Sequence, residues 1–301
     1  MALATPPDMI RALDGFFVSR FGLDAAHAVS MAPDSPPLFL NFALATNSWD
    51  ELERKRHDAE LGIRAPPADG EDTPEVEAVF TENKRVKIVY FVRHAEGYHN
   101  VAERELGTER WEAVEAKDEK YLDADLTPFG IQDTEEKGPP TMEAELRRGM
   151  PPVDRVIVST LSRAIQTAEH FFKPDQGPRP FTAIELCRET LGVHTCDKRR
   201  TRTELKNKFP EVDFSKIEDE NDVLWSPTHR ETDEELQRRA RSFLSQLFHE
   251  IDESHVAVVT HSGFISAIWS LFHDQTFKPA NCEVVPLALE WHASKAVADV
   301  Q

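Results

Sequence analysis

Cysteine is scarce in this 301-residue sequence, which holds only Cys187, Cys196 and Cys282. Three cysteines at such wide spacing are too few for a disulfide framework, and they do not match the ligand spacing of a thiolate metal site. Proteins of the cytosol keep their thiols reduced, whereas small secreted proteins depend on disulfides. We therefore expect buried, reduced cysteines in a cytosolic protein.

Long hydrophobic runs are also lacking. The apolar early segment Phe16-Phe17-Val18 is broken by Asp14 before it and by Arg20 after it. A secretory signal or a membrane-spanning helix needs a much longer uninterrupted apolar stretch. The sequence thus predicts neither of these segments, and a cytoplasmic location is expected.

Positive charge is the third scarce feature, because 35 Lys and Arg residues stand against 54 Asp and Glu residues, a net charge of -19. Nucleic acids and anionic membranes bind basic protein surfaces, so neither is expected as a partner. A hydrophobic content of 40% and a charged content of 30% are those of an ordinary soluble domain. Any pocket for an anionic substrate must therefore be basic locally.

The first third of the chain, residues 1–84, is predicted to be an extension that packs on the core and ends in a linker. Apolar residues at helical spacing predict a helix in Met9–Phe21, and Trp49–Leu61 is predicted as a short charged helix. Residues 62–84 carry prolines, a glycine and many acids, which favour an exposed linker.

Residues 85–295 are predicted to form one domain in which buried strands alternate with helices. The strand runs are rich in Val and Ile with few polar interruptions, which is typical of strands buried on both faces. This alternation predicts an α/β fold with a doubly wound, mostly parallel sheet flanked by helices. The predicted strands are Val86–Val92, Val153–Ser159, Phe181–Cys187, Val256–Thr260 and Val284–Trp291.

Several helix boundaries follow from capping residues and prolines. A helix is expected to begin after Asn100 and to run toward Lys117. Thr127-Pro128 supplies the N-cap and the first residue of the next helix. Gly138-Pro139-Pro140 is expected to interrupt that helix, with a further helix beginning at Thr141.

Polar residues of related kinds follow four of the predicted strands. Because the carboxyl ends of parallel strands meet at one edge of a sheet, we expect these side chains to converge. An arginine can bind two phosphoryl oxygens at once, and an imidazole can attack phosphorus. The sequence therefore predicts a phosphoryl-transfer site at this edge, built from Arg93-His94, Arg163, Arg188-Glu189 and His261.

The segment Arg93-His94-Ala95-Glu96 with Asn100 resembles the Arg-His-Gly signature of the histidine phosphatase (phosphoglycerate mutase-like) superfamily. Ala95 stands where that family usually has glycine, and alanine fits there if the backbone φ is negative. The similarity covers roughly residues 86–291, and the run from Cys187 to Arg200 is similar to plant and fungal phosphoglycerate mutase-like proteins. Other matching segments are Ser159-x-x-Ser-Arg163-Ala-x-Gln-Thr-Ala168, Arg188-Glu189-x-x-Gly192 and Thr260-His261-Ser262-Gly263.

The resemblance implies transfer through a covalent phosphohistidine. His94 is then the nucleophile, and Glu189 protonates the leaving oxygen before it activates water. Cationic side chains take the place of a metal, so no cofactor is expected, and the histidines lack the close spacing of a zinc site. The expected phosphate-binding residues are Arg93, Gly97, Asn100, Arg163 and a protonated His261, with Arg199 from the basic run 198–202 as a further candidate.

The reaction itself is open between alternatives. A phosphatase acting on a small phosphorylated metabolite is preferred, because the long insert after Glu189 lacks a convincing match to a mutase sequence. A phosphomutase of the phosphoglycerate mutase type would use the same pocket. A catalytically inactive phospho-ligand binding module is the third alternative, although His94, Arg163 and His261 are all present. The substrate and the oligomeric state are not specified.

Overall fold

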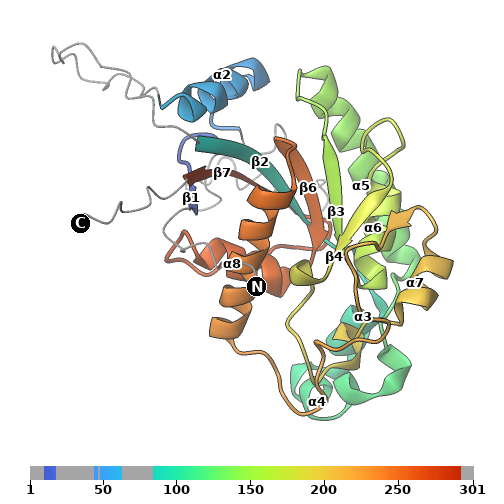
Figure 1. Ribbon diagram of the computed structural model, residues 1–301. Helices are drawn as coiled ribbons and strands as arrows, with labels where there is room; N and C mark the ends of the chain where they lie inside the picture. Colours follow the sequence, from blue (N-terminus) through green and yellow to red (C-terminus); the bar gives the residue numbers. More distant parts are fainter. Residues whose placement is uncertain (1–9, 18–43, 47, 63–83, 293–301) are drawn as a thin grey trace, which may run out of the picture.

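The computed structural model describes residues 10–17, 44–46, 48–62 and 84–292. Its centre is a seven-stranded sheet with the strand order β1-β7-β2-β6-β3-β4-β5 (Figure 1). The five strands from β2 to β5 pair in parallel, and β7 is antiparallel to both of its neighbours. The predicted α/β fold with a mostly parallel sheet is confirmed. The strands are β1 Ile10–Ala12, β2 Lys84–Arg93, β3 Arg155–Ser159, β4 Phe181–Ile184, β5 Val212–Asp213, β6 His255–Thr260 and β7 Val284–His292.

Helices cover both faces of this sheet. Helices α8 and α9 bury their apolar residues against one face, and α2, α5 and α6 bury theirs against the other (Figure 1). No helix among the described residues combines the length and the apolar character needed to cross a membrane. The helices are α2 Trp49–Glu60, α3 Tyr98–Leu106, α4 Thr108–Ala113, α5 Pro128–Arg147, α6 Ser162–Phe171, α7 Arg202–Lys208, α8 Asp233–Glu250 and α9 Ser262–Ser270.

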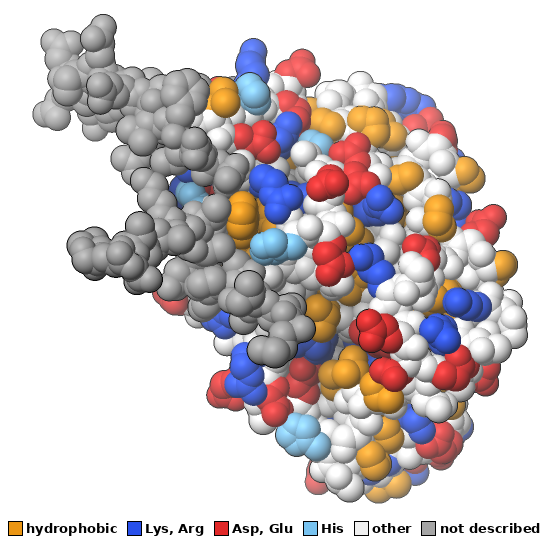
Figure 2. Space-filling view, viewed as in Figure 1, with side chains coloured by type: hydrophobic (Ala, Val, Ile, Leu, Met, Phe, Trp, Pro, Cys, Tyr) orange, Lys and Arg blue, Asp and Glu red, His pale blue; other side chains and the backbone are white. Residues whose placement is uncertain are grey.

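Strand β2 has this central place because both of its faces are apolar. Ile88 and Tyr90 belong to the core cluster on the α5 and α6 side, whereas Val89 and Phe91 belong to the cluster under α8. Each such side chain, once buried, contributes about 1.5–3 kcal/mol. By contrast, acidic and basic side chains are interspersed on the face shown in Figure 2.

Helix α5 corrects one prediction. It begins at Thr127-Pro128 as expected, but it runs through Gly138-Pro139-Pro140 to Arg147 without interruption. The two prolines lack the backbone N–H groups of helical hydrogen bonds. The helix is nevertheless packed tightly against α6 at this point, because a Cβ on Gly138 would lie 2.7 Å from the Phe171 ring. Gln176 donates a side-chain hydrogen bond to the Pro139 carbonyl at 3.0 Å. Close packing on α6 therefore outweighs the lost helical hydrogen bonds.

The predicted helix in Met9–Phe21 is wrong over its described part, because residues 10–12 form β1. This short strand pairs antiparallel with β7, with Ile10 opposite Trp291. The edge of β7 offers backbone hydrogen bonds to these three residues. This pairing outweighs their local preference for a helix. The helix predicted from Trp49 is confirmed as α2, whose N-cap is Ser48. The predicted linker falls almost wholly on residues 63–83, which lie outside the described residues, and the domain boundary stays a prediction.

Two boundaries near the carboxyl edge also differ from the predictions. The helix expected after Asn100 begins earlier, at Tyr98, and Gly107 separates α3 from α4 with a φ of 80°. A residue with a Cβ would be strained at that angle, so glycine permits the break. The strand expected to reach Cys187 ends at Ile184, and a 3-10 turn over Glu185–Cys187 follows.

Candidate active site

The register of β2 and β6 brings the two predicted histidines together. Arg93 pairs with Thr260, so His94 and His261 leave the sheet at the same level. The His94 amide donates to the Thr260 carbonyl at 2.8 Å, and the centroids of the two imidazole rings lie 5.0 Å apart. Two residues separated by 167 positions in the sequence, His94 and His261, are therefore in ring contact at the carboxyl edge.

The His94 ring is held in a defined orientation. Its Nδ1 lies 2.7 Å from the carbonyl oxygen of Ala95, an atom that can only accept, so Nδ1 carries the hydrogen. The lone pair is then on Nε2. Burial, and next the charge of Arg163, hold the pKa of His94 well below its ordinary value. The unprotonated Nε2 is consequently a competent nucleophile at neutral pH.

Arg163, in the first turn of α6, reaches that nitrogen. Its Nε–H donates to His94 Nε2 at 3.3 Å, and its Nη1 donates to the Cys196 carbonyl at 2.6 Å. Its Nη2 forms an ion pair with Asp197 at 2.9 Å, and both side chains are buried. Because several acceptors fix the guanidinium, it cannot swing out to solvent without breaking a buried ion pair.

Asp197 is a site residue that the sequence analysis did not identify. Its second carboxylate oxygen accepts from Arg230 Nη1 at 2.8 Å, so one carboxylate joins two arginines. Burial raises the pKa of this carboxyl, but the two guanidinium groups lower it further, to about 2. Asp197 is therefore ionised at neutral pH.

His261 presents one nitrogen to the site without a partner. Its Nε2 lies 2.7 Å from the Ser159 hydroxyl, whereas its buried Nδ1 has no hydrogen-bond partner in the part of the chain that the structure describes. Burial and then Arg163 hold the pKa of His261 well below its ordinary value. The protonated form expected from the sequence is thus disfavoured in the absence of an anion, and a phosphate group would favour it.

Two further buried nitrogens, Arg93 Nε and His99 Nδ1, lack hydrogen-bond partners among residues 10–17, 44–46, 48–62 and 84–292. The His99 ring centroid lies 5.4 Å from that of His94, and burial lowers the pKa of His99 as well. Buried polar atoms are nearly always paired in folded proteins. His261 Nδ1 and Arg93 Nε are therefore candidates to donate to a phosphate oxygen, whereas His99 Nδ1 lies against Gly97. His99, in the first turn of α3, is the second residue near His94 that was not among the predicted site residues.

Gly97, the N-cap of α3, and Asn100, in the first turn of that helix, are hydrogen-bonded to each other. The Gly97 amide donates to Asn100 Oδ1 at 3.0 Å, so this amide is not free for a ligand. Asn100 Nδ2 has no partner among the described residues and remains able to donate. A Cβ on Gly97 would lie 2.8 Å from His99 Nδ1, which explains the glycine. The contribution of this pair is therefore centred on Asn100.

Glu189 lies against the first turn of α9. Its Oε2 accepts from the Gly263 amide at 3.2 Å, and its Oε1 accepts from the Thr190 amide at 2.9 Å. A Cβ on Gly263 would lie 2.2 Å from Oε1, so only glycine leaves room for this carboxylate. Burial lowers the pKa of Arg93, and the negative charge of Glu189 partly opposes this decrease. Glu189 thus lies within electrostatic range of the pocket.

Arg199, a predicted phosphate-binding residue, has no free donor for a substrate. All five of its guanidinium hydrogens have protein acceptors, since Nε donates to Glu185 and the two Nη atoms donate to four backbone carbonyls. The side chain is buried. Its role is to hold the loop over residues 219–222, and it offers no donor to a substrate.

One trio among the described residues, His194, Cys196 and Asp197, has atoms close enough to hold a metal ion. The close histidine spacing that is typical of zinc sites is lacking in the sequence, so the trio arises only from folding. Asp197 is already paired with two arginines, and their charges oppose the binding of a cation. The trio is therefore poorly suited to hold a metal ion.

Comparisons with known proteins place the chain in a family. A family model described as the histidine phosphatase superfamily (branch 1) matches residues 89–289. A phosphoglycerate mutase-like protein of Arabidopsis thaliana is 38% identical over 214 residues, which cover 62% of this chain and 75% of the relative. Phosphoglycerate mutase-like protein 1 of the same plant is 35% identical over 235 residues, covering 66% and 80%. A mycobacterial glucosyl-3-phosphoglycerate phosphatase aligns over 68% of this chain and 91% of its own, at 18% identity and a TM-score of 0.41, and carries no further inference.

Proposed function

The chain belongs to the histidine phosphatase superfamily, and on that premise we propose that it is a phosphatase that hydrolyses a phosphate monoester of a small metabolite. The observation that carries the proposal is the state of His94. Its Nδ1 donates to the Ala95 carbonyl, which leaves the lone pair on Nε2, where it faces the guanidinium of Arg163. These features favour a covalent phosphohistidine intermediate.

In the first step, His94 Nε2 attacks phosphorus in line with the leaving oxygen. The N–P bond forms as the P–O bond breaks, and the leaving oxygen takes a proton from Glu189. In this role Glu189 is the general acid of the first step and the general base of the second. In the second step, water attacks phosphorus, Glu189 takes the water's proton, and the N–P bond breaks to release phosphate.

The equatorial phosphoryl oxygens need positive charge in both steps. Arg93 and Arg163 supply two guanidinium groups, and Arg163 would transfer its Nε–H from His94 to a phosphate oxygen. His261 Nδ1 and Asn100 Nδ2 supply further donors, and His261 gains a proton as the anion enters. Because fixed cations already fill the role of a metal, we propose that turnover is independent of divalent ions.

A phosphomutase is the alternative, and the names of the plant relatives favour it. The phosphoryl group on His94 would then pass to a second hydroxyl instead of water. The two reactions diverge only after the intermediate has formed, so they share every residue described above.

A panel of phosphate esters tests the proposal, with released phosphate as the readout and with chelator in every assay. A phosphatase releases phosphate from at least one ester at a rate that chelator does not change. Loss of activity in chelator with recovery on adding a divalent ion would contradict the metal-independent mechanism. Isomerisation of a phosphorylated sugar acid without phosphate release would identify the mutase instead.

A further inference from the structure

Arg230 is a partly exposed arginine whose guanidinium is used on one side only. Its Nη1 donates to Asp197 at 2.8 Å and to the carbonyls of Thr190 at 2.9 Å and Gly192 at 2.7 Å. Its Nε and Nη2 have no hydrogen-bond partner among the described residues. The side chain remains 33% exposed although its ion-pair partner is only 3% exposed. One edge of the guanidinium is therefore fixed by the protein and the other is open.

Arg199 shows what an arginine with a purely structural role looks like in the same chain. It is buried, and protein acceptors take all five of its N–H groups. Arg230 makes three contacts through a single nitrogen and leaves the Nε–Nη2 edge bare. That edge is the one with which arginine binds a carboxylate or a phosphate through two parallel hydrogen bonds.

Arg230 is linked to the proposed catalytic residues by two sets of contacts. Asp197 bridges Arg230 to Arg163, which in turn contacts His94. Thr190, one of its carbonyl partners, directly follows Glu189, the proposed acid. Burial disfavours the charge of Arg230, but Asp197 and Glu189 more than offset this, so the pKa of Arg230 lies above its ordinary value.

The local charge also favours an anion. Arg93, Arg163 and Arg230 carry three positive charges against the two carboxylates of Asp197 and Glu189, in a chain whose net charge is -19. One unit of positive charge is thus uncompensated within this group of five side chains. A phosphoryl group on His94 would use Arg163, which leaves Arg230 for a different anionic group.

We propose that Arg230 is a substrate-binding residue whose Nε–Nη2 edge binds a second anionic group, a carboxylate or a phosphate, on the leaving group of the ester. The inference rests on the proposed function, because it names the class of ester that the phosphatase prefers. Asp197 and the two carbonyls hold the guanidinium in place before the substrate arrives, so little side-chain entropy is lost on binding.

Three esters with the same two-carbon leaving group separate the possibilities. Ethyl phosphate has no second anion, phosphoglycolate adds a carboxylate, and ethane-1,2-diyl bisphosphate adds a phosphate. Wild-type kcat/KM should be about 10- to 100-fold higher for at least one anionic ester, the range of a hydrogen-bonded charged contact. The ester that is preferred identifies the second group.

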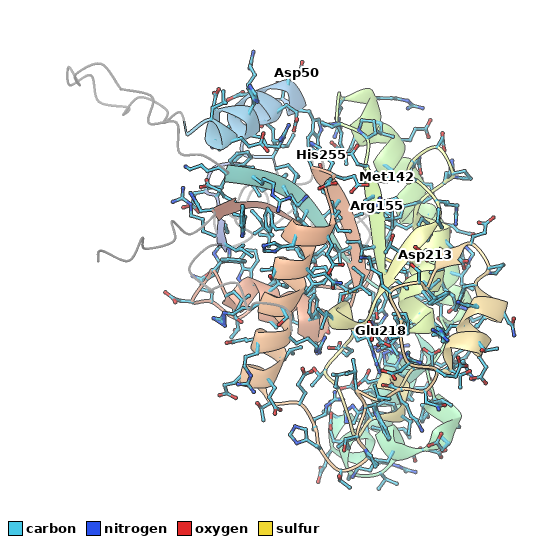
Figure 3. All side chains as sticks on the ribbon, in the orientation of Figure 1. Asp50, Met142, Arg155, Asp213, Glu218 and His255 are labelled. Atoms are coloured by element: carbon cyan, nitrogen blue, oxygen red, sulfur yellow. The ribbon has the colours of Figure 1, made fainter. Side chains whose placement is uncertain are left out.

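The variants are Arg230→Met and Arg230→Lys, with Arg155→Met as the matched control. Arg155 is 37% exposed and paired with Glu253, and Figure 3 shows it near His255, at the end of the sheet away from α3. Arg230→Met should remove most of the preference, mainly through KM. Arg230→Lys keeps a positive charge beside Asp197 but lacks the two parallel N–H donors of a guanidinium, so it too should lose the preference. This variant serves as the test if the Met variant does not fold.

Three outcomes would be decisive against the inference or against its premise. Equal kcat/KM for all three esters in the wild type overturns the inference and leaves the phosphatase intact. A loss that is equal for all three esters in both Arg230 variants shows that Arg230 acts only through Asp197, which also overturns it. Hydrolysis of none of the esters, including those of the wider panel, refutes the proposed function itself.

Discussion

Arg163 joins the nucleophile to a buried carboxylate, since it donates to His94 Nε2 at 3.3 Å and pairs with Asp197 at 2.9 Å. An arginine at a strand end in a polar pocket would matter for chemistry and little for folding. Arg163 differs because the ion pair that it forms is buried on both sides. The same side chain therefore contributes to phosphate binding and to the stability of the loop that carries Asp197.

Arg163→Ala should lower kcat/KM by about 10²–10³-fold, the cost of removing one preorganised charge stabiliser. The free energy of unfolding should also fall by about 3 kcal/mol, because Asp197 loses one of its two buried partners. Steady-state kinetics and urea unfolding measure the two effects. Wild-type turnover would mean that Arg163 merely begins α6, and unchanged stability would mean that the ion pair is energetically neutral.

Glu189→Gln should lose far more activity on an alkyl phosphate than on nitrophenyl phosphate. An alkoxide needs a proton in order to leave, whereas nitrophenolate leaves readily without one. Comparing kcat/KM for the two esters in wild type and variant measures this. Equal losses on the two esters would remove Glu189 from the acid role.

Gly263→Ala should reproduce that pattern without touching Glu189 itself. The added methyl would lie 2.2 Å from Glu189 Oε1 and would displace the carboxylate. Alanine is otherwise favourable in a helix by about 1 kcal/mol relative to glycine, so the fold should persist. A variant with the wild-type ratio of alkyl to nitrophenyl activity would show that Glu189 does not act from this position.

Stability should fall as the pH drops below about 6.5. The pKa values of His94, His99 and His261 are held well below that of free histidine by burial. The unfolded chain therefore binds protons that the folded chain does not, and each such histidine costs about 1.4 kcal/mol per pH unit. Asp123 has the opposite effect on the pH dependence of stability. Burial raises its pKa to about 6, so below that pH the folded chain binds a proton that the unfolded chain does not yet bind, and this stabilises the fold.

A comparison of variants isolates the histidine contribution from that of Asp123. In His99→Gln, the free energy of unfolding should fall less steeply than in wild type, by about 1.4 kcal/mol per pH unit below pH 6. Urea unfolding at pH 7.5, 6.5 and 5.5 measures this slope. Parallel curves for the two proteins would show that His99 titrates normally in the folded state.

The parts of the fold that the sequence predicts are those with a local cause. Strand β2 was predictable because its residues are apolar on both faces, and the start of α5 because Thr127-Pro128 is a capping signal. The passage of α5 through Pro139-Pro140 was not predictable, since it depends on contact with Phe171. Strand β1 was not predictable either, because it depends on the edge of β7.

The candidate site divides in the same way. His94 and His261 follow strands in the sequence, so parallel pairing alone brings them together. Asp197 lies in a 3-10 turn, and nothing in the sequence separates it from the many other acids of the chain. Arg230 gains its position by tertiary contacts with Asp197 and with the carbonyls of Thr190 and Gly192. Such residues become recognisable once tertiary contacts pair them, because local spacing carries no signal for them.

The central claim is that His94 carries the phosphoryl group, and trapping the intermediate tests it most directly. Enzyme mixed with a ³²P-labelled ester that it hydrolyses, quenched in base within one turnover and digested, should yield a labelled peptide that contains His94. The label should be stable in base and labile in acid. It should lie on Nε2, because Nδ1 is hydrogen-bonded to the Ala95 carbonyl. His94→Ala should give no label. A label on another residue, or a pre-steady-state burst without any labelled protein, would contradict the account.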